Sequence, residues 1–92
     1  MATSHSSPAP DGDEDLRLLH GIVAILAVER RSRGITLREL GAETGYNSGY
    51  YSRAERGETQ PSLVSLCRWS RALGLDFVGL AQRVRDERRV DP

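Results

Sequence analysis

Residues 45–57, GYNSGYYSRAERG, contain the side chains of this sequence that are best suited to binding chemistry. The segment opens with three poor helix formers, Asn47, Ser48 and Gly49, and ends in arginines. On a helical wheel, one arc is small, polar and basic, and it consists of Ser48, Gly49, Ser52, Arg53 and Arg56. Small residues allow a close approach to another surface, and arginine pairs well with phosphate groups. This arc is therefore suited to contact with a polyanion.

The opposite arc of the same segment is bulky and apolar. We expect Tyr51 and Ala54 to lie in the core, and Tyr50 either to pack against the protein or to contact phosphate. The sequence TGYN at residues 44–47 forms a glycine-containing turn between this helix and the one before it. Two short helices joined in this way are the geometry of a helix-turn-helix, whose second helix lies in the major groove of DNA.

Start and stop signals predict an all-α fold of five short helices. Acidic residues precede a helix over residues 16–32, and Thr36 with Glu39 forms a capping box for a second helix that ends at Gly45. The remaining three helices are expected between Asn47 and Gly57, between Ser62 and Gly74, and after Asp76. The apolar stripes of the last two are expected to be Leu63, Leu66, Ser70 and Leu73, then Phe77, Leu80, Ala81 and Val84, with Trp69 on the flank.

Length and charge indicate one small domain with a modestly basic body. The chain has 92 residues, with 13 basic and 13 acidic side chains and no lysine. Residues 1–15 hold four of the acids and no base, so residues 16–92 carry 13 minus 9, a net charge of +4. We expect a disordered acidic tail over residues 1–14, a folded domain over residues 15–86 and a frayed end over residues 87–92.

Several classes of protein are disfavoured by composition. Cys67 is the only cysteine, so no intrachain disulfide can form, and with His5 and His20 it makes no metal-ligand cluster. The sequence lacks a nucleophile with a base, a paired carboxylate motif and a phosphate-binding loop, so we expect no enzyme activity and no cofactor. The apolar run over residues 22–28 is too short to span a bilayer, and we expect a cytoplasmic protein.

Residues 30–80, with the marks RG-I-T-LREL, SGYYSRAERG, PSL and RALGL, resemble the Cro/C1-type (XRE) helix-turn-helix domain of phage repressors and bacterial regulators. The resemblance implies a five-helix, lambda-repressor-like fold, base contacts from Ser48, Gly49 and Arg53, and a structural ion pair of Arg30 with Glu55. The candidate DNA-binding residues are Arg38, Asn47, Ser48, Gly49, Tyr50, Ser52, Arg53 and Arg56.

Three positions depart from the pattern of that family. Leu37 stands where many members have a phosphate-binding glutamine, and Glu58 lies in a loop that often carries a basic residue. Glu29 replaces a commonly apolar residue of the first helix. The first two departures predict modest affinity for DNA, and the third predicts unusual packing of the first helix.

The first helix is apolar on two faces. One face holds Leu16, Leu19, Val23 and Leu26, and the nearly opposite face holds Leu18, Ile22, Ile25 and Val28. A helix that is apolar all round is buried on both sides. The second face therefore requires a cover, which is either the C-terminal helix of the same chain or another protomer. We take Leu18, Ile22, Ile25 and Val28 as candidates for a dimer interface.

Two hypotheses about function follow. The first is a sequence-specific DNA-binding regulator, a repressor that binds a palindromic operator on double-stranded DNA as a homodimer through residues 47–56. The alternative is an antitoxin or adaptor that binds another protein through its apolar first helix, with DNA binding secondary. In either case we expect control by a separate regulatory protein or by protein concentration rather than by a small ligand, and we expect no membrane partner.

Overall fold

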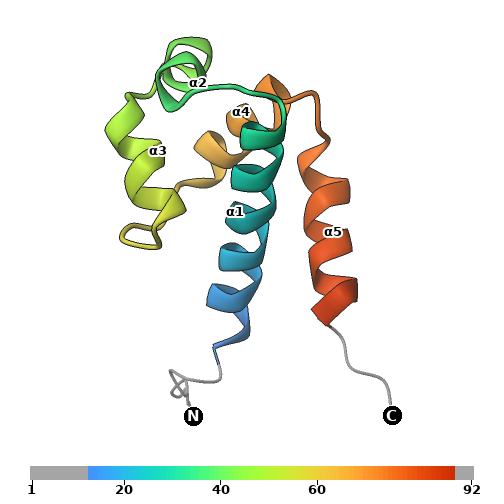
Figure 1. Cartoon of the computed structure of the whole chain (residues 1–92). Helices are drawn as coiled ribbons and strands as arrows, with labels where there is room; N and C mark the ends of the chain where they lie inside the picture. The colour runs from blue at the N-terminus through green and yellow to red at the C-terminus, as the bar shows by residue number, and fades with distance from the viewer. Residues whose placement is uncertain (1–12, 89–92) are drawn as a thin grey trace.

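The computed structural model describes residues 13–88, and it contains five helices and no strand within that range. They are α1 (Glu14–Ser32), α2 (Leu37–Thr44), α3 (Ser48–Glu55), α4 (Leu63–Ala72) and α5 (Phe77–Arg88) (Figure 1). The predicted all-α, five-helix fold is confirmed.

Local capping signals place the ends of the helices that matter most for the site. The Thr36 hydroxyl accepts a hydrogen bond from the Glu39 amide at 3.0 Å, and the Glu39 carboxylate accepts one from the Thr36 amide at 2.8 Å. The Asn47 side chain accepts a hydrogen bond from the Tyr50 amide at 2.7 Å and caps α3. Gly45 ends α2 in the left-handed conformation, with φ of 88°. These caps are the ones that the sequence predicts.

The ends of the folded domain differ from the prediction. The helix α1 begins at Glu14, and the Asp13 carboxylate caps it by accepting hydrogen bonds from the amides of Asp15 and Leu16. Two residues assigned to the acidic tail therefore belong to the first helix and its cap, because an aspartate side chain satisfies amides of the first turn. At the other end, α5 continues to Arg88, past the predicted start of fraying at residue 87. The rest of the predicted tail and frayed end lies outside the described residues.

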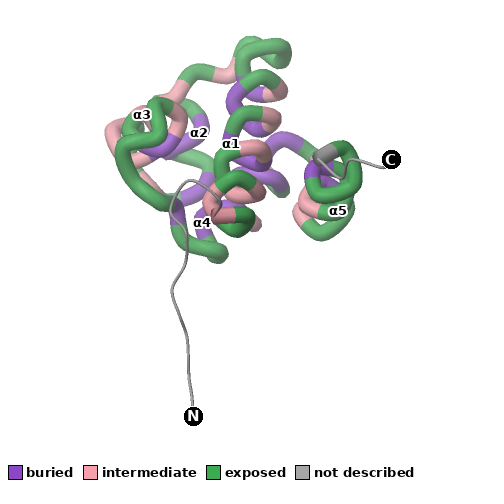
Figure 2. Tube along the Cα trace, turned by 90° about the horizontal axis from the view of Figure 1, so that it is seen from below, coloured by how far each residue is buried: buried purple, intermediate pink, exposed green. Residues whose placement is uncertain are grey.

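The helix α1 lies at the centre of the arrangement. It contacts α3 and α4 on one side and α5 on the other (Figures 1 and 2). In Figure 2 the buried stretches of the tube lie mainly where these helices approach one another. The largest fully buried side chains of this core are Trp69, Tyr51, Leu26 and Leu40, contributed by α4, α3, α1 and α2. One core therefore joins the helix-turn-helix to the rest of the bundle.

Most of the second apolar face of α1 is covered within the protomer, so Ile22 is removed from the candidates for a dimer interface. Ile22 is only 4% exposed and belongs to the core, while Leu18 and Ile25 are half-buried against it. The helix α5 supplies much of this cover, because it runs so close to α1 that a Cβ on Gly21 would lie 2.7 Å from a methyl group of Val84. Of the four candidates, Val28 alone is largely exposed, at 58%.

The buried face of α4 differs from the prediction at two positions. Leu63, expected in the core, is 64% exposed, whereas Trp69, expected on the flank, is fully buried. Leu66, Ser70 and Leu73 are buried as predicted. The Trp69 ring lies edge-on to Tyr51, with ring centroids 4.9 Å apart, so packing of the two largest core residues decides which side of α4 faces inward.

The close contact between α2 and the turn depends on Gly41, which the sequence analysis did not single out. A Cβ at this position would lie 2.4 Å from the backbone oxygen of Tyr46 and 3.3 Å from the backbone nitrogen of Ser48. Both neighbours are main-chain atoms, so they cannot move aside without displacing the turn that leads into α3. Gly41 therefore sets how closely α3 approaches α2.

We predict that Gly41→Ala destabilises the fold by about 1–3 kcal/mol, because an added methyl group overpacks this contact. The matched control is Gly49→Ala, whose Cβ would meet the flexible end of the Arg53 side chain at 3.2 Å and would lie 3.4 Å from Oδ1 of Asn47, with no backbone atom in the way. That control should leave stability unchanged or raise it by up to about 1 kcal/mol, since glycine is a poor helix former. Thermal melts followed by circular dichroism measure both. Equal stabilities for wild type and Gly41→Ala would contradict the prediction.

Candidate nucleic-acid interface

The outward face of α3 carries the polar residues predicted for binding. Asn47, Ser48, Arg53 and Arg56 are exposed, and Gly49 and Ser52 are half-buried. On the inward face, Tyr51 and Ala54 are buried as predicted. The helix therefore has one side fixed in the core and one side open to solvent, which is the arrangement required of a helix that enters a groove.

Gly49 provides room for the side chain of Arg53. A Cβ on Gly49 would lie 3.2 Å from Nη1 of Arg53 and 3.4 Å from Oδ1 of Asn47. The guanidinium group of Arg53 thus lies back along the helix toward its N-terminus. It lies close to the place that a side chain at position 49 would occupy. Gly49 was predicted as a site of close approach to DNA, and in the free protein the same space admits the arginine.

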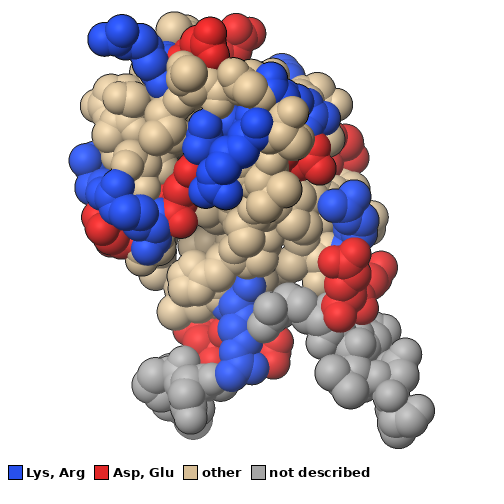
Figure 3. All heavy atoms as spheres, viewed as in Figure 1, with Lys and Arg blue, Asp and Glu red and all other residues tan. Residues whose placement is uncertain are grey.

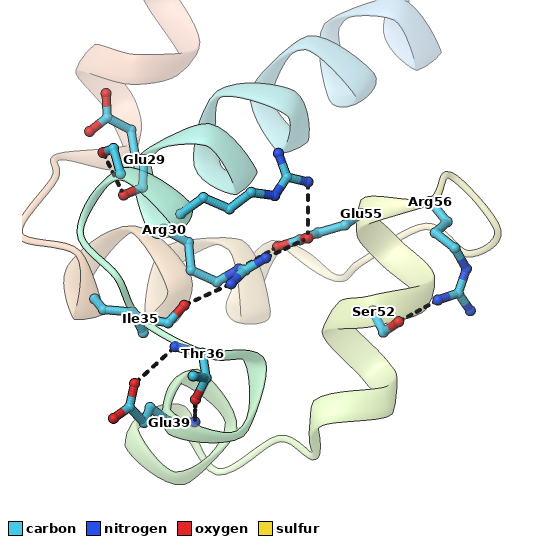
Figure 4. A network of polar contacts seen from close by, with 10 residues as sticks. Glu29, Arg30, Ile35, Thr36, Glu39, Ser52, Glu55 and Arg56 are labelled. Atoms are coloured by element: carbon cyan, nitrogen blue, oxygen red, sulfur yellow. Dashed lines mark hydrogen bonds and ion pairs between the residues drawn. The ribbon is translucent and has the colours of Figure 1, made fainter.

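Arg56 at the end of α3 is held by two side chains of its own neighbourhood. Its Nε and Nη2 donate hydrogen bonds to the two carboxylate oxygens of Glu58, at 2.8 and 3.1 Å, and its Nη1 donates to the hydroxyl of Ser52. Figure 4 shows the Arg56 side chain directed at Ser52. The hydrogen bonds with Arg56 lower the pKa of the Glu58 carboxyl group, and those with Glu58 raise the pKa of Arg56. Both residues stay charged at neutral pH.

The predicted pair of Arg30 and Glu55 is present, and it attaches the last turn of α3 to α1 (Figure 4). Nε and Nη2 of Arg30 donate to the two carboxylate oxygens of Glu55, at 2.8 and 3.0 Å. Nη1 of Arg30 donates to the backbone oxygen of Ile35 at 2.7 Å, in the loop before α2. The two side chains are 10% and 7% exposed. Removing either partner would leave a buried charge, so this pair fixes where α3 ends.

Tyr50 packs against α4, the first of its two predicted roles. Its hydroxyl accepts a hydrogen bond from the Ser62 amide at 3.0 Å and donates one to the Ser65 hydroxyl at 2.7 Å. Its ring stacks on Tyr46, with centroids 4.6 Å apart. Burial raises the pKa of the Tyr50 hydroxyl, and the hydrogen bonds with Ser65 and Ser62 outweigh burial and lower it overall. The hydroxyl therefore ties the middle of α3 to the start of α4.

The turn before α3 is held from the opposite side by Arg68, which the sequence analysis missed. Nη1 of Arg68 donates to the backbone oxygen of Thr44 at 3.2 Å, and its guanidinium group lies over the Tyr46 ring, 5.7 Å from the centroid. Thr44 in turn accepts a hydrogen bond from the Tyr51 hydroxyl at 2.6 Å. No sequence pattern links position 68 to position 44, so only the packing of α4 on α2 could indicate this contact.

Arg38 lies on the same side of the turn as the start of α3. It is exposed, and it lines a shallow groove together with Gly41, Ala42, Gly45, Tyr46, Asn47 and Ser48. The groove brings a basic side chain from α2 next to the first residues of α3. Leu37, at the start of the same helix, is half-buried against the core. Its side chain is apolar and offers no hydrogen bond to a phosphate there.

Arginine side chains are visible over α3 and the loop after it, interleaved with carboxylates (Figure 3). The local carboxylates are Glu55, which is buried against Arg30, and Glu58, which is bound to Arg56.

Within residues 13–88, no group of three or more histidine, cysteine or acidic side chains is placed to hold a metal ion. No helix in this range has the length and apolar character needed to cross a membrane.

Comparison with known proteins assigns this arrangement to a family. A helix-turn-helix family model matches residues 26–80, which is more than half of the chain. An uncharacterized HTH-type transcriptional regulator, y4dJ of Sinorhizobium fredii, is 36% identical over 66 residues, covering 72% of this chain and 83% of that protein.

Among solved structures, the clp gene regulator ClgR from Corynebacterium glutamicum is similar, with a TM-score of 0.66 and 30% sequence identity. The match covers 76% of this chain and 74% of the ClgR chain. Both relatives are named as regulators, and the matched region contains both helices of the motif described above, α2 and α3. The chain therefore belongs to the Cro/C1-type (XRE) helix-turn-helix family of DNA-binding transcriptional regulators.

Proposed function

We propose that this protein is a sequence-specific DNA-binding repressor whose helix α3 lies in the major groove. The observation that carries the proposal is the division of α3 into a fixed inner side and an open outer side. Tyr51, Ala54 and Glu55 are held by the core and by Arg30, while Ser48 and Arg53 face solvent. A rigidly held helix can present side chains to base edges in a defined register.

Each exposed residue has a distinct proposed role. Arg53 is the longest side chain on the outer face between the cap and Glu55, and it contacts a guanine, the commonest specific partner of arginine. Ser48 contacts a base or phosphate at the first turn, where the positive end of the helix dipole also favours an anion. Arg38 and Arg56 contact phosphates on either side of the groove and position α3 without selecting sequence.

The proposed assembly is a twofold dimer on a palindromic operator, with the two α3 helices about 34 Å apart. Burial of Ile22 removes the original reason to place the dimer interface on α1. Leu63 and Val64, at the start of α4, are 64% and 53% exposed. The Tyr50 hydroxyl ties this region to α3, because it accepts a hydrogen bond from the Ser62 amide and donates one to the Ser65 hydroxyl. We therefore propose that Leu63 and Val64 meet their counterparts in a second protomer.

We predict that Arg53→Ala weakens binding to the operator by about 1–3 kcal/mol and relaxes specificity at one base pair per half-site. The reason is the loss of the one long side chain proposed to contact a base. The operator is first selected from a pool of random duplexes, and affinities for operator and mixed-sequence DNA are then measured at one salt concentration. The matched control is Arg85→Ala, which removes an exposed arginine from α5.

The control should lower the two affinities equally and only slightly, since it changes charge away from α3. If Arg53→Ala also weakens both DNAs equally, then Arg53 is a phosphate contact and specificity arises elsewhere. If wild-type protein selects no sequence from the pool, the proposed function itself is wrong.

For the dimer, we predict that Leu63→Glu converts the protein to a monomer while Val28→Glu does not. Burial of each leucine or valine side chain is worth about 1.5–3 kcal/mol, and a buried carboxylate reverses that gain. Both positions are exposed in the protomer, so both variants should fold. Sedimentation velocity measures the oligomeric state. Monomeric Val28→Glu with dimeric Leu63→Glu would assign the interface to α1, and a monomeric wild type at high protein concentration would overturn the dimer.

A further inference from the structure

The pairing of Arg56 with Glu58 occupies an arginine that is proposed to bind DNA. Both carboxylate oxygens of Glu58 accept hydrogen bonds from Arg56, in a two-point arrangement at 2.8 and 3.1 Å. This is the geometry in which a guanidinium group binds a phosphate. The side chains are 55% and 52% exposed, so the pair lies at the surface where DNA would approach.

The backbone after α3 holds Glu58 in position for this pairing. The Glu58 amide donates a hydrogen bond to the Arg53 carbonyl at 2.9 Å, and the Gly57 amide donates one to the Ala54 carbonyl at 3.0 Å. Gly57 adopts the left-handed conformation, with φ of 76°, which turns the chain back beside α3. The carboxylate is thus brought to Arg56 by a defined turn.

We propose that Glu58 is an intramolecular competitor for phosphate, which holds Arg56 in the free protein and gives it up only when a DNA phosphate takes its place. The inference rests on the proposed function, in which Arg56 contacts phosphate. Because the competition does not depend on base sequence, it lowers affinity for all DNA. The protein must then depend more on base contacts, such as that of Arg53, to remain on any site.

The expected effect is a modulation of affinity. Exposed ion pairs are screened by water and salt, so loss of the pair should change affinity by a factor of about two to five. The salt dependence should change as well. When Arg56 leaves the Glu58 carboxylate to bind a phosphate, it only exchanges one anionic partner for another. An unpaired Arg56 that binds a phosphate neutralises a further DNA charge and releases a counterion. Freeing Arg56 should therefore steepen the salt slope by up to about one unit per protomer.

The test compares Glu58→Gln with wild type on a duplex of mixed sequence, using fluorescence anisotropy over a salt series. Glutamine keeps the size of the side chain and removes its charge. We expect Glu58→Gln to bind about two- to fivefold tighter at low salt, with a steeper salt slope. The matched control is Glu87→Gln, which removes the carboxylate of the exposed Arg83–Glu87 pair on α5, a helix that does not contact α3. The control should show a smaller gain.

The same substitution in an Arg56→Ala background separates competition from simple charge repulsion. If Glu58 acts by holding Arg56, the gain from Glu58→Gln should disappear when Arg56 is absent. An equal gain in both backgrounds overturns the proposal, because Glu58 would then act by repelling phosphate directly. If wild-type protein binds DNA but Glu58→Gln alone gives no gain in affinity, the competition proposal is also overturned, while the proposed function is left intact. Absence of any DNA binding by wild type would instead refute the proposed function.

Discussion

An eight-residue helix is too short to be stable alone in water, and α3 (Ser48–Glu55) therefore depends on what holds it. Its attachments come from three other helices, α4, α1 and α2. Tyr51 packs against Trp69 of α4, Glu55 pairs with Arg30 of α1, and the turn before it fits against Gly41 of α2. Together these contacts supply the order that local helix propensity does not. The weak start of α3 is tolerated because its position is determined by tertiary structure.

The contacts on the inner side of α3 hold the helix in place. The residues on its outer side therefore need not stabilise the helix and can serve binding. Gly49 contributes nothing to helix propensity, yet its missing side chain leaves space for Arg53 in the free protein and for DNA in the proposed complex. The outer arginines also differ in how they are held. Arg53 lies over a glycine, whereas Arg56 is bound to Glu58 and Ser52. Arg53 is the arginine that we propose to select a base, and Arg56 is the one whose access to phosphate we propose Glu58 to control.

Features with a local origin were predictable from sequence, and those that depend on packing between helices were not. The caps at Thr36, Asn47 and Ser62 were predicted correctly because each cap side chain accepts a hydrogen bond from an amide only three residues further along the chain. The full burial of Trp69 on α4 was not predicted, because it depends on packing against Tyr51 of another helix. The sequence also left open what covers Ile22, since an apolar face does not identify its partner, and here α5 is part of the cover. Glu58 was recognised as unusual, but its hydrogen bonds with Arg56 could be found only from the turn geometry.

The most direct test of α3 as the DNA-binding element is to record backbone amide and arginine side-chain chemical shifts during titration with a selected operator duplex. We predict the largest changes at residues 47–49, at Arg53 and Arg56, and at Arg38, with little change along α5. Signals of the Arg30 and Glu55 pair should persist unchanged in position, because α3 binds as a rigid part of the bundle. Changes confined to α5 or to the outer face of α1, with α3 unaffected, would contradict this assignment of the interface.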